Sequence, residues 1–132
     1  MNYLSAYGEN RRSSLYEKAK EIRNISRRIS DYLLPDMECL NENGQENKHI
    51  YFTGDILRQS NSLIAHINKA ETEFFQDNRH KYVASVQILT ERLYRTCERL
   101  ENYNSNGREF LQILQKELLK FRRLQRVWRL TL

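Results

Sequence analysis

The residues best able to do chemistry lie in a cation-rich stretch near the end of the sequence. Residues 116–129 contain a single acid, Glu117, and six cations: Lys116, Lys120, Arg122, Arg123, Arg126 and Arg129. A helix turns by about 100° per residue, so Arg122, Arg126 and Arg129 would share one face. An apolar line on another face contains Phe110, Leu114, Phe121 and Trp128. The stretch therefore predicts a helix with a core stripe and a cationic stripe, and the cationic stripe favours an anionic partner.

A second cationic stripe, Lys20, Arg23 and Arg27, has helical spacing near the start of the sequence. The net charge is +5, and the excess is concentrated in residues 11–34 and 106–132. Arginine predominates in both places, and its planar guanidinium suits bidentate contact with phosphate. We therefore predict binding of RNA or DNA without base-specific readout. The residues predicted to bind it are Lys20, Arg23, Arg27, Lys120, Arg122, Arg123, Arg126 and Arg129.

Two other interpretations of the basic faces stay open. Arg92, Arg95 and Arg99 form a third stripe, but acids of the same segment, such as Glu91, can pair with Arg95. A solvated surface is therefore the favoured interpretation of that stripe. For the protein as a whole, the alternative function is that of a protein–protein adaptor whose basic face docks an acidic partner.

Four apolar stripes with spacings of three and four residues predict four helices, at about residues 12–34, 55–75, 79–103 and 107–130. One Pro and four Gly in 132 residues are typical of a helical protein. Short polar turns and matched lengths predict a single all-α domain, an antiparallel up-down four-helix bundle. Residues 35–54 are acidic and predict a mobile loop. In such a bundle the first and last helices are neighbours, so we expect their cationic stripes to form one patch.

Local signals mark the helix ends. Ser14 and Glu17 fit a capping box, Pro35 is expected to end or kink the first helix, and Thr53 or Asp55 could cap the second. The residues expected to face the core are Leu15, Ala19, Ile22, Ile25, Ile29 and Leu33; Ile56, Ser60, Leu63, Ile67, Ala70 and Phe74; and Tyr82, Val86, Leu89, Leu93, Cys97 and Leu100.

Patterns for catalysis or metal binding are weak. A di-iron bundle site needs two Glu-x-x-His motifs and further inward Glu residues, whereas this sequence has one match, Glu46 to His49, in the polar segment. His66 and His80 lie on separate segments with no nucleophile suggested nearby. Gly-rich phosphate loops, Gly-x-Ser-x-Gly and Cys-x-x-Cys are absent from the sequence. We therefore predict a protein that is not an enzyme and has no metal or cofactor.

Cysteine usage and hydropathy predict a cytoplasmic protein. The N-terminal residues lack the apolar region of a secretion signal, and no apolar run approaches the 18 residues of a membrane span. We therefore expect no membrane association and interpret Cys39 and Cys97 as reduced thiols.

Some apolar residues fall outside the core stripes. Ile88 projects among the arginines of its helix, and Leu119, Val127 and Leu130 lie away from the apolar line of the last helix. A monomer of this size would not normally expose them together. We therefore predict a homo-oligomer whose interface contains Ile88, Leu119, Val127 and Leu130.

Residues 55–70, Asp-Ile-Leu-Arg-Gln-Ser-Asn-Ser-Leu-Ile-Ala-His-Ile-Asn-Lys-Ala, resemble the second helix of a family of small bacterial four-helix-bundle proteins. Its members are encoded in intervening sequences of 23S ribosomal RNA genes, and a related branch is the accessory variability determinant (Avd) of diversity-generating retroelements. The family pattern is Ile-Arg-Arg…Ser-Ile-Pro-Ala-Asn-Ile-Ala-Glu-Gly. The positions that fall on it are Ile56 or Leu57, Arg58, Ser62, Ala65 and Ile67.

Two further segments, 82–91 and 121–129, are similar to the third helix of the family and to the basic end of the Avd branch. The sequence departs from the family where Ile64 replaces its Pro and where Lys69 to Glu71 replace its Glu-Gly ending. The resemblance implies a pentameric, basic barrel that binds nucleic acid and, in the Avd branch, a reverse transcriptase.

Overall fold

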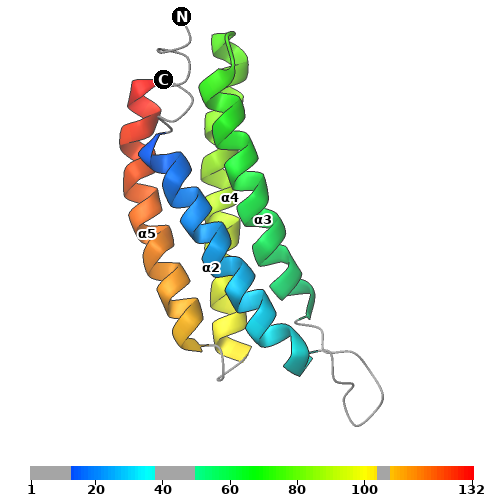
Figure 1. Cartoon of the computed structure of the whole chain (residues 1–132). Coiled ribbons are helices and arrows are strands. Elements are labelled where there is room, and N and C mark those ends of the chain that lie inside the picture. The colour runs from blue at the N-terminus through cyan, green and yellow to red at the C-terminus, as the bar shows by residue number, and fades with distance from the viewer. Residues whose placement is uncertain (1–12, 38–49, 104–107) are drawn as a thin grey trace, which may run out of the picture.

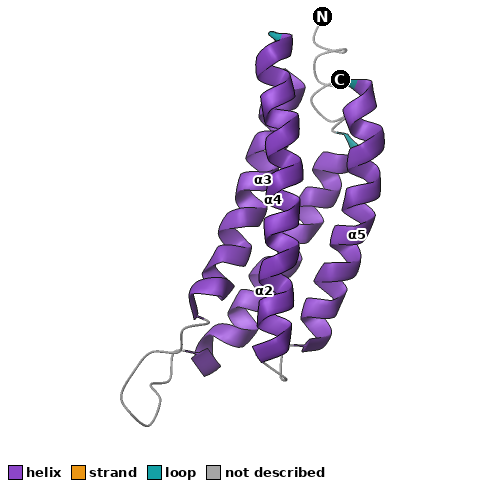
Figure 2. Ribbon diagram, turned by 180° about the vertical axis from the view of Figure 1, so that it is seen from behind, coloured by secondary structure: helices purple, strands orange, loops and turns teal. Residues whose placement is uncertain are grey.

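The computed structural model describes residues 13–37, 50–103 and 108–132, and these residues form four α-helices (Figure 1). The helices are α2 (Ser14–Met37), α3 (Ile50–Thr72), α4 (Gln76–Tyr103) and α5 (Arg108–Thr131). Consecutive helices run in opposite directions, and the view from behind shows helix in every described segment (Figure 2). Each helix packs against its neighbours in sequence, and α5 closes the ring against α2. The predicted all-α, up-down four-helix architecture is confirmed.

The first helix begins one residue earlier than the predicted capping box implies. Ser13 is the N-cap, since the backbone N–H of Tyr16 donates to Ser13 Oγ at 3.1 Å. Glu17 is therefore one residue beyond the position from which a capping-box carboxylate reaches back. The capping box predicted on Ser14 and Glu17 is wrong, although a helix does start there.

Helices α2 and α3 both extend into the segment predicted to be a loop. Helix α2 continues through Pro35 to Met37. The helix tolerates this proline because it lies in the last turn, where it removes only one backbone hydrogen bond. Helix α3 starts at Ile50, so Thr53 and Asp55 lie inside it and neither is its N-cap. Its interior Gly54 costs only about 1 kcal/mol relative to Ala, which a long packed helix tolerates. Of the predicted mobile loop, residues 38–49 lie outside the described residues.

The turn between α3 and α4 corrects one core prediction. Helix α3 ends at Thr72, so the helical spacing that placed Phe74 on the core stripe no longer applies there. Phe74 is 85% exposed and Phe75 is 65% exposed, and their rings meet edge to face with centroids 5.6 Å apart. These two aromatic side chains stand at the end of the bundle and contribute nothing to its core.

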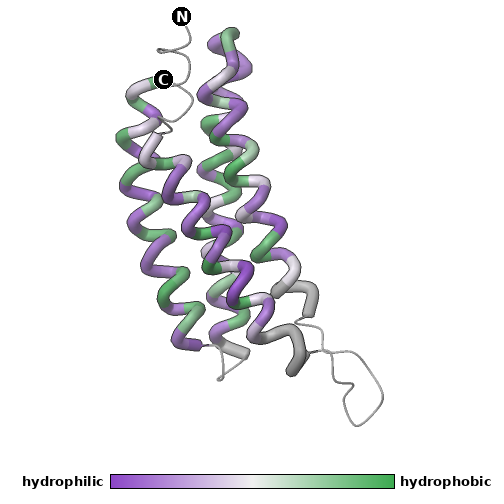
Figure 3. Tube along the Cα trace, in the orientation of Figure 1, coloured by the Kyte–Doolittle hydropathy of each residue, from purple (hydrophilic) through white to green (hydrophobic). Residues whose placement is uncertain are grey.

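The core is formed by the apolar stripes of all four helices, and apolar and polar positions alternate along each helix (Figure 3). Its largest fully buried side chain is Phe121. The buried residues that the sequence predicted are Leu15, Ala19, Ile22, Ile29, Ile56, Ser60, Leu63, Ile67, Ala70, Val86, Leu93, Cys97, Leu100, Leu114, Phe121 and Trp128. Partly buried Ile25, Tyr82 and Leu89 pack against them, whereas the side chain of Leu33 lies outside the described residues.

Two features of the packing were not expected. Phe110, predicted to be in the core, is 41% exposed and packs its ring against Tyr32 at a centroid distance of 5.1 Å. It lies in the first turn of α5. Buried hydroxyls also line the interior, and Ser26 and Thr90 satisfy theirs by donating to carbonyls one turn earlier, at 2.8 and 2.7 Å.

None of the four helices has an apolar stretch of the length that a bilayer crossing requires.

Candidate anion-binding face

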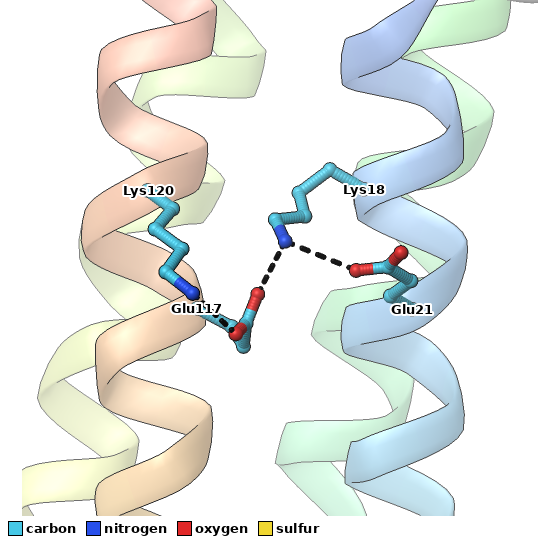
Figure 4. Close-up of polar contacts among 4 residues, drawn as sticks. All are labelled: Lys18, Glu21, Glu117 and Lys120. Carbon is cyan, nitrogen blue, oxygen red and sulfur yellow. Dashed lines mark hydrogen bonds and ion pairs between the residues drawn. The ribbon is translucent and has the colours of Figure 1, made fainter.

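The seam between α2 and α5 is closed by a cluster of two lysines and two glutamates (Figure 4). Lys18 Nζ lies 2.5 Å from Glu117 Oε2 and 3.0 Å from Glu21 Oε2, and Lys120 Nζ lies 3.2 Å from Glu117 Oε1. The hydrogen bond with Lys18 holds the pKa of Glu117 below its usual value, and the same bond raises the pKa of Lys18. The charges of the cluster balance. Lys120, which was predicted to contact nucleic acid, thus already has an acidic partner.

The predicted cationic stripe of α2 lies on the opposite flank of that helix. Lys18 faces α5, and Lys20, Arg23 and Arg27 follow at rotations of about 140–200° from it. Arg27 is exposed, whereas Arg23 is partly buried with an Nε atom that makes no hydrogen bond in the described structure. Lys20 Nζ lies over the Tyr16 ring, 5.7 Å from its centroid. This stripe and that of α5 therefore do not form the single patch expected from the sequence.

The cationic stripe of α5 instead faces α4. Arg122 Nη2 lies 2.9 Å from Glu91 Oε1, and its guanidinium carbon lies 5.5 Å from the centroid of the Tyr94 ring. Arg126 and Arg129 are exposed on the same side. The helical spacing was correct, but helix adjacency alone could not say which neighbour the stripe would face.

A polar pocket of about 290 Å³ lies in the groove between α4 and α5 and is lined by Gln87, Glu91, Arg122, Gln125, Arg126 and Arg129. Gln125 is only 6% exposed, and its carboxamide makes no hydrogen bond within the described parts of the chain. The Nε atom of Arg122 is also buried without a hydrogen-bond partner there. The Gln125 carboxamide is not among the fully buried unpartnered atoms, so it is open to the pocket and can bond a ligand there.

Gln125 was missed by sequence reasoning. It follows Phe121 by four residues and precedes Trp128 by three, which places it on the core stripe of α5. A polar residue at a position where helical spacing demands an apolar one was the signal that could have found it.

A second pocket, of about 430 Å³, adjoins the first and is lined by Arg79, His80, Val83, Ala84, Gln87, Arg129 and Leu132. The two pockets share Gln87 and Arg129. Arg79 is held in place because its Nε and Nη2 both donate to the carbonyl oxygen of Glu73, at 3.2 and 2.8 Å. The α4–α5 groove thus has an arginine-rich half and a more apolar half.

The arginines of α4 extend the cationic surface beyond this groove. Arg92, Arg95 and Arg99 are exposed and line a further pocket of about 220 Å³ at the seam with α3. Pairing of Arg92 and Arg95 with acids of the same helix was expected, but Glu91 pairs with Arg122 of α5 instead. Within residues 13–37, 50–103 and 108–132, Arg92 and Arg95 make no ion pair.

We call the set Arg92, Arg95, Arg99, Arg122, Arg126 and Arg129 the α4–α5 arginine face. On α4, Arg95 lies about 40° around the helix from Glu91, which borders the groove, and Arg99 lies about 80° from it. The cations therefore continue from the groove across the outer surface of α4. Arg123, the remaining residue predicted to bind nucleic acid, is exposed on α5 and does not line the groove.

The other titratable groups are not assembled into a site. His66 packs the edge of its ring against Tyr82, and burial, aided by Lys69, lowers its pKa. Burial raises the pKa of the Cys97 thiol. The described segments contain no group of three or more His, Cys, Asp or Glu side chains that could hold a metal ion. Glu46, His49 and Cys39 lie outside the described residues.

The four predicted interface residues are all exposed. Ile88 on α4 is 52% exposed, and Leu119, Val127 and Leu130 on α5 are 40%, 63% and 82% exposed. By helical spacing Ile88 lies between Arg95 and Arg99 on the outer surface of α4, whereas Val127 lies about 100° around α5 from Arg126 and away from the groove.

No protein-family model, curated protein or solved structure matches this chain. Over residues 13–37, 50–103 and 108–132 the chain is all-α, with four helices in an up-down arrangement. The function must therefore be argued from the groove and from the arginines around it.

Proposed function

We propose that this protein is a non-enzymatic nucleic-acid-binding bundle that contacts phosphates through the α4–α5 arginine face. The observation that carries the proposal is the set of arginines on adjacent helices that lack acidic partners. Arg92, Arg95, Arg126 and Arg129 form no ion pair within the described part of the chain. Unneutralised guanidinium groups on one side of a protein attract a polyanion and displace its counterions.

The location differs from the one the sequence suggested. The α2 stripe lies on the far flank of its helix, and Lys120 belongs to the α2–α5 seam. We therefore leave Lys20, Arg23, Arg27 and Lys120 outside the proposed face. This difference makes the proposal testable with variants that remove equal charge from two sides of one molecule.

Salt dependence measures the number of phosphates contacted. Each phosphate neutralised contributes a slope of about −0.7 for single strands and about −0.9 for duplex DNA in a plot of log affinity against log salt. Four arginines engaged with phosphate predict that raising salt from 50 to 200 mM weakens binding about 50-fold for single strands and about 150-fold for duplex.

The deciding experiment compares two triple variants of equal charge. Arg95→Gln, Arg126→Gln and Arg129→Gln together should weaken binding of a labelled RNA oligonucleotide at least tenfold and lower the salt slope by about two. The matched control on α2 is Lys20→Gln, Arg27→Gln and Arg28→Gln, which should change affinity less than threefold. Circular dichroism of both variants checks that they remain helical. Equal losses in the two variants, or no binding by wild type at 50 mM salt, would refute the proposal.

An acidic protein is the second candidate partner. Ile88 is exposed among the arginines of α4, and apolar surface of this kind contributes to protein interfaces but not to phosphate contacts. If wild type binds no RNA at 50 mM salt, the adaptor function replaces nucleic-acid binding.

Self-association belongs to the same proposal, because Ile88, Leu119, Val127 and Leu130 leave apolar surface uncovered. The family resemblance would make the assembly a pentamer and add a reverse transcriptase as partner. Light scattering tests the first point, since a mass near the 16.0 kDa of one chain at tens of micromolar would exclude an oligomer. Co-purification with a reverse transcriptase encoded beside the gene tests the second.

A further inference from the structure

The α4–α5 groove contains two adjoining pockets, one rich in arginine and one more apolar. Contacts to the phosphates of a nucleic acid would use the first pocket and leave the second without a role. We propose that this groove binds one nucleotide of a single strand, with its phosphate in the arginine-rich pocket and its base in the adjoining apolar pocket. The inference rests on the proposed function and names the form of nucleic acid that the groove selects.

The arginine-rich pocket is suited to a phosphate. Three arginines and one glutamate line it, so it keeps a positive excess even though Glu91 pairs with Arg122. The ion pair uses Nη2 of Arg122, while its buried Nε remains without an acceptor in the described structure. Gln125 is 6% exposed as a whole residue, and its carboxamide, which makes no hydrogen bond in the described structure, is not fully enclosed and lines this pocket. A phosphate oxygen accepts from the Gln125 amide N–H and from the guanidinium groups that line the pocket, which a cation cannot do.

The adjoining pocket is suited to a base. Val83, Ala84 and Leu132 provide apolar walls, and the guanidinium groups of Arg79 and Arg129 provide planar cations on which a base can stack. Its volume of about 430 Å³ lies within the range of about 300–1,000 Å³ typical of ligand pockets. Arg79 is fixed in advance by its two hydrogen bonds to the Glu73 carbonyl, which lowers the entropic cost of stacking.

The two pockets are placed as a nucleotide requires. A phosphate and its base are joined through one sugar, so they must occupy adjoining sites. Gln87 and Arg129 line both pockets and form their boundary. A phosphate ligand alone would leave the apolar half of the groove without a function.

Strand preference follows from this geometry. In a duplex each base is stacked and paired, and it can enter a lateral pocket only by flipping out of the helix at a cost in free energy. A single strand unstacks readily and can present its bases to side chains. We therefore expect a preference for single strands, with little base selectivity because stacking is tolerant of sequence.

The test fills the base pocket without changing charge. Ala84 is exposed on α4 and lines the pocket, so Ala84→Leu should narrow it while leaving the arginines in place. The matched control is Ala65→Leu, since Ala65 is an exposed alanine on α3 and outside both pockets. Leucine favours helix, so both variants should fold. Fluorescence anisotropy then measures binding of a labelled 12-nucleotide RNA and of a duplex of the same length.

The expected result is tighter binding of the single strand by wild type and weaker single-strand binding by Ala84→Leu only. Loss of one base stack corresponds to a decrease in affinity of about five- to 150-fold. Gln125→Leu should also weaken the single strand, whereas Gln115→Leu, on the same helix and outside both pockets, should not.

Four outcomes would overturn the inference, and only the last of them is also a failure of the proposed function. If wild type binds duplex as tightly as single strand, the nucleotide site is wrong while the arginine face stands. If Ala84→Leu weakens both nucleic acids equally, or binds like Ala65→Leu, the apolar pocket holds no base. If wild type binds neither nucleic acid at 50 mM salt, the proposed function itself is refuted and the nucleotide site with it.

Discussion

Replacing Glu117 with glutamine should loosen the seam that closes the four-helix ring between α2 and α5. The substitution keeps the shape of the side chain and removes the charge that meets Lys18 at 2.5 Å. Both side chains are mostly buried, at 17% and 18% exposed, so solvent screens their interaction only in part. The expected loss lies between the roughly 0–1 kcal/mol of an exposed pair and the roughly 3–5 kcal/mol of breaking a buried one. We expect Glu117→Gln to lower the free energy of unfolding by about 1–2 kcal/mol.

Urea unfolding measures this loss directly. Trp128 is the only tryptophan in the chain and is 6% exposed, so its fluorescence reports unfolding without a label. With a denaturant dependence of about 2 kcal/mol per molar urea, Glu117→Gln should lower the unfolding midpoint by about 0.5–1 M at pH 7. A double-mutant cycle with Lys18→Met separates the pair interaction from other effects of each substitution.

The pH dependence gives a second and independent test. The pKa of Glu117 is lowered in the folded state, so the carboxylate binds its proton less readily there than in the unfolded chain. Its stabilisation is therefore present above the ordinary pKa of 4.5 and is lost as pH falls through the lower, folded-state pKa. The pKa of Lys18 is raised, so the lysine end of the pair persists until pH exceeds its ordinary 10.5. The stability difference between wild type and Glu117→Gln should be constant from about pH 6 to 9 and shrink in acid.

Two results would refute this reasoning. A difference below about 0.3 kcal/mol at pH 7 would mean that the pair behaves as a fully solvated one. A difference that stays constant from pH 7 down to pH 2 would mean that the substitution acts through packing, because glutamine and a protonated glutamate differ little in charge.

Two further predictions concern the core. Phe121→Ala should destabilise the protein by about 3–5 kcal/mol, because the ring is fully buried. Phe74→Ser should change stability by less than about 0.5 kcal/mol, because that ring is 85% exposed. Urea unfolding of both variants measures the difference. Cys97 is buried and burial raises the pKa of its thiol, so the thiol should resist a thiol reagent at pH 8 in the native protein and react in urea. Mass spectrometry of the labelled peptide shows which state has reacted. Rapid labelling of the native protein would contradict the burial.

The spacing of apolar residues was enough to predict most of the fold. Because side chains three and four residues apart share a face, the apolar stripes predicted both the helices and most of the buried residues, among them Ile22, Leu63 and Phe121. The errors lie at helix ends, where spacing gives no information. Phe74 left the core once α3 ended at Thr72, and Ser13 rather than Ser14 became the N-cap.

The site could be predicted only in part. The sequence by itself determined that Arg122, Arg126 and Arg129 share a face, because their relative angles are set within one helix. It could not determine which neighbouring helix that face would meet, since the rotation of a helix about its axis is settled by packing all four apolar stripes together. Only the tertiary structure turned the α5 arginines toward α4, paired Arg122 with Glu91, and left Gln125 buried without a partner in the resulting groove.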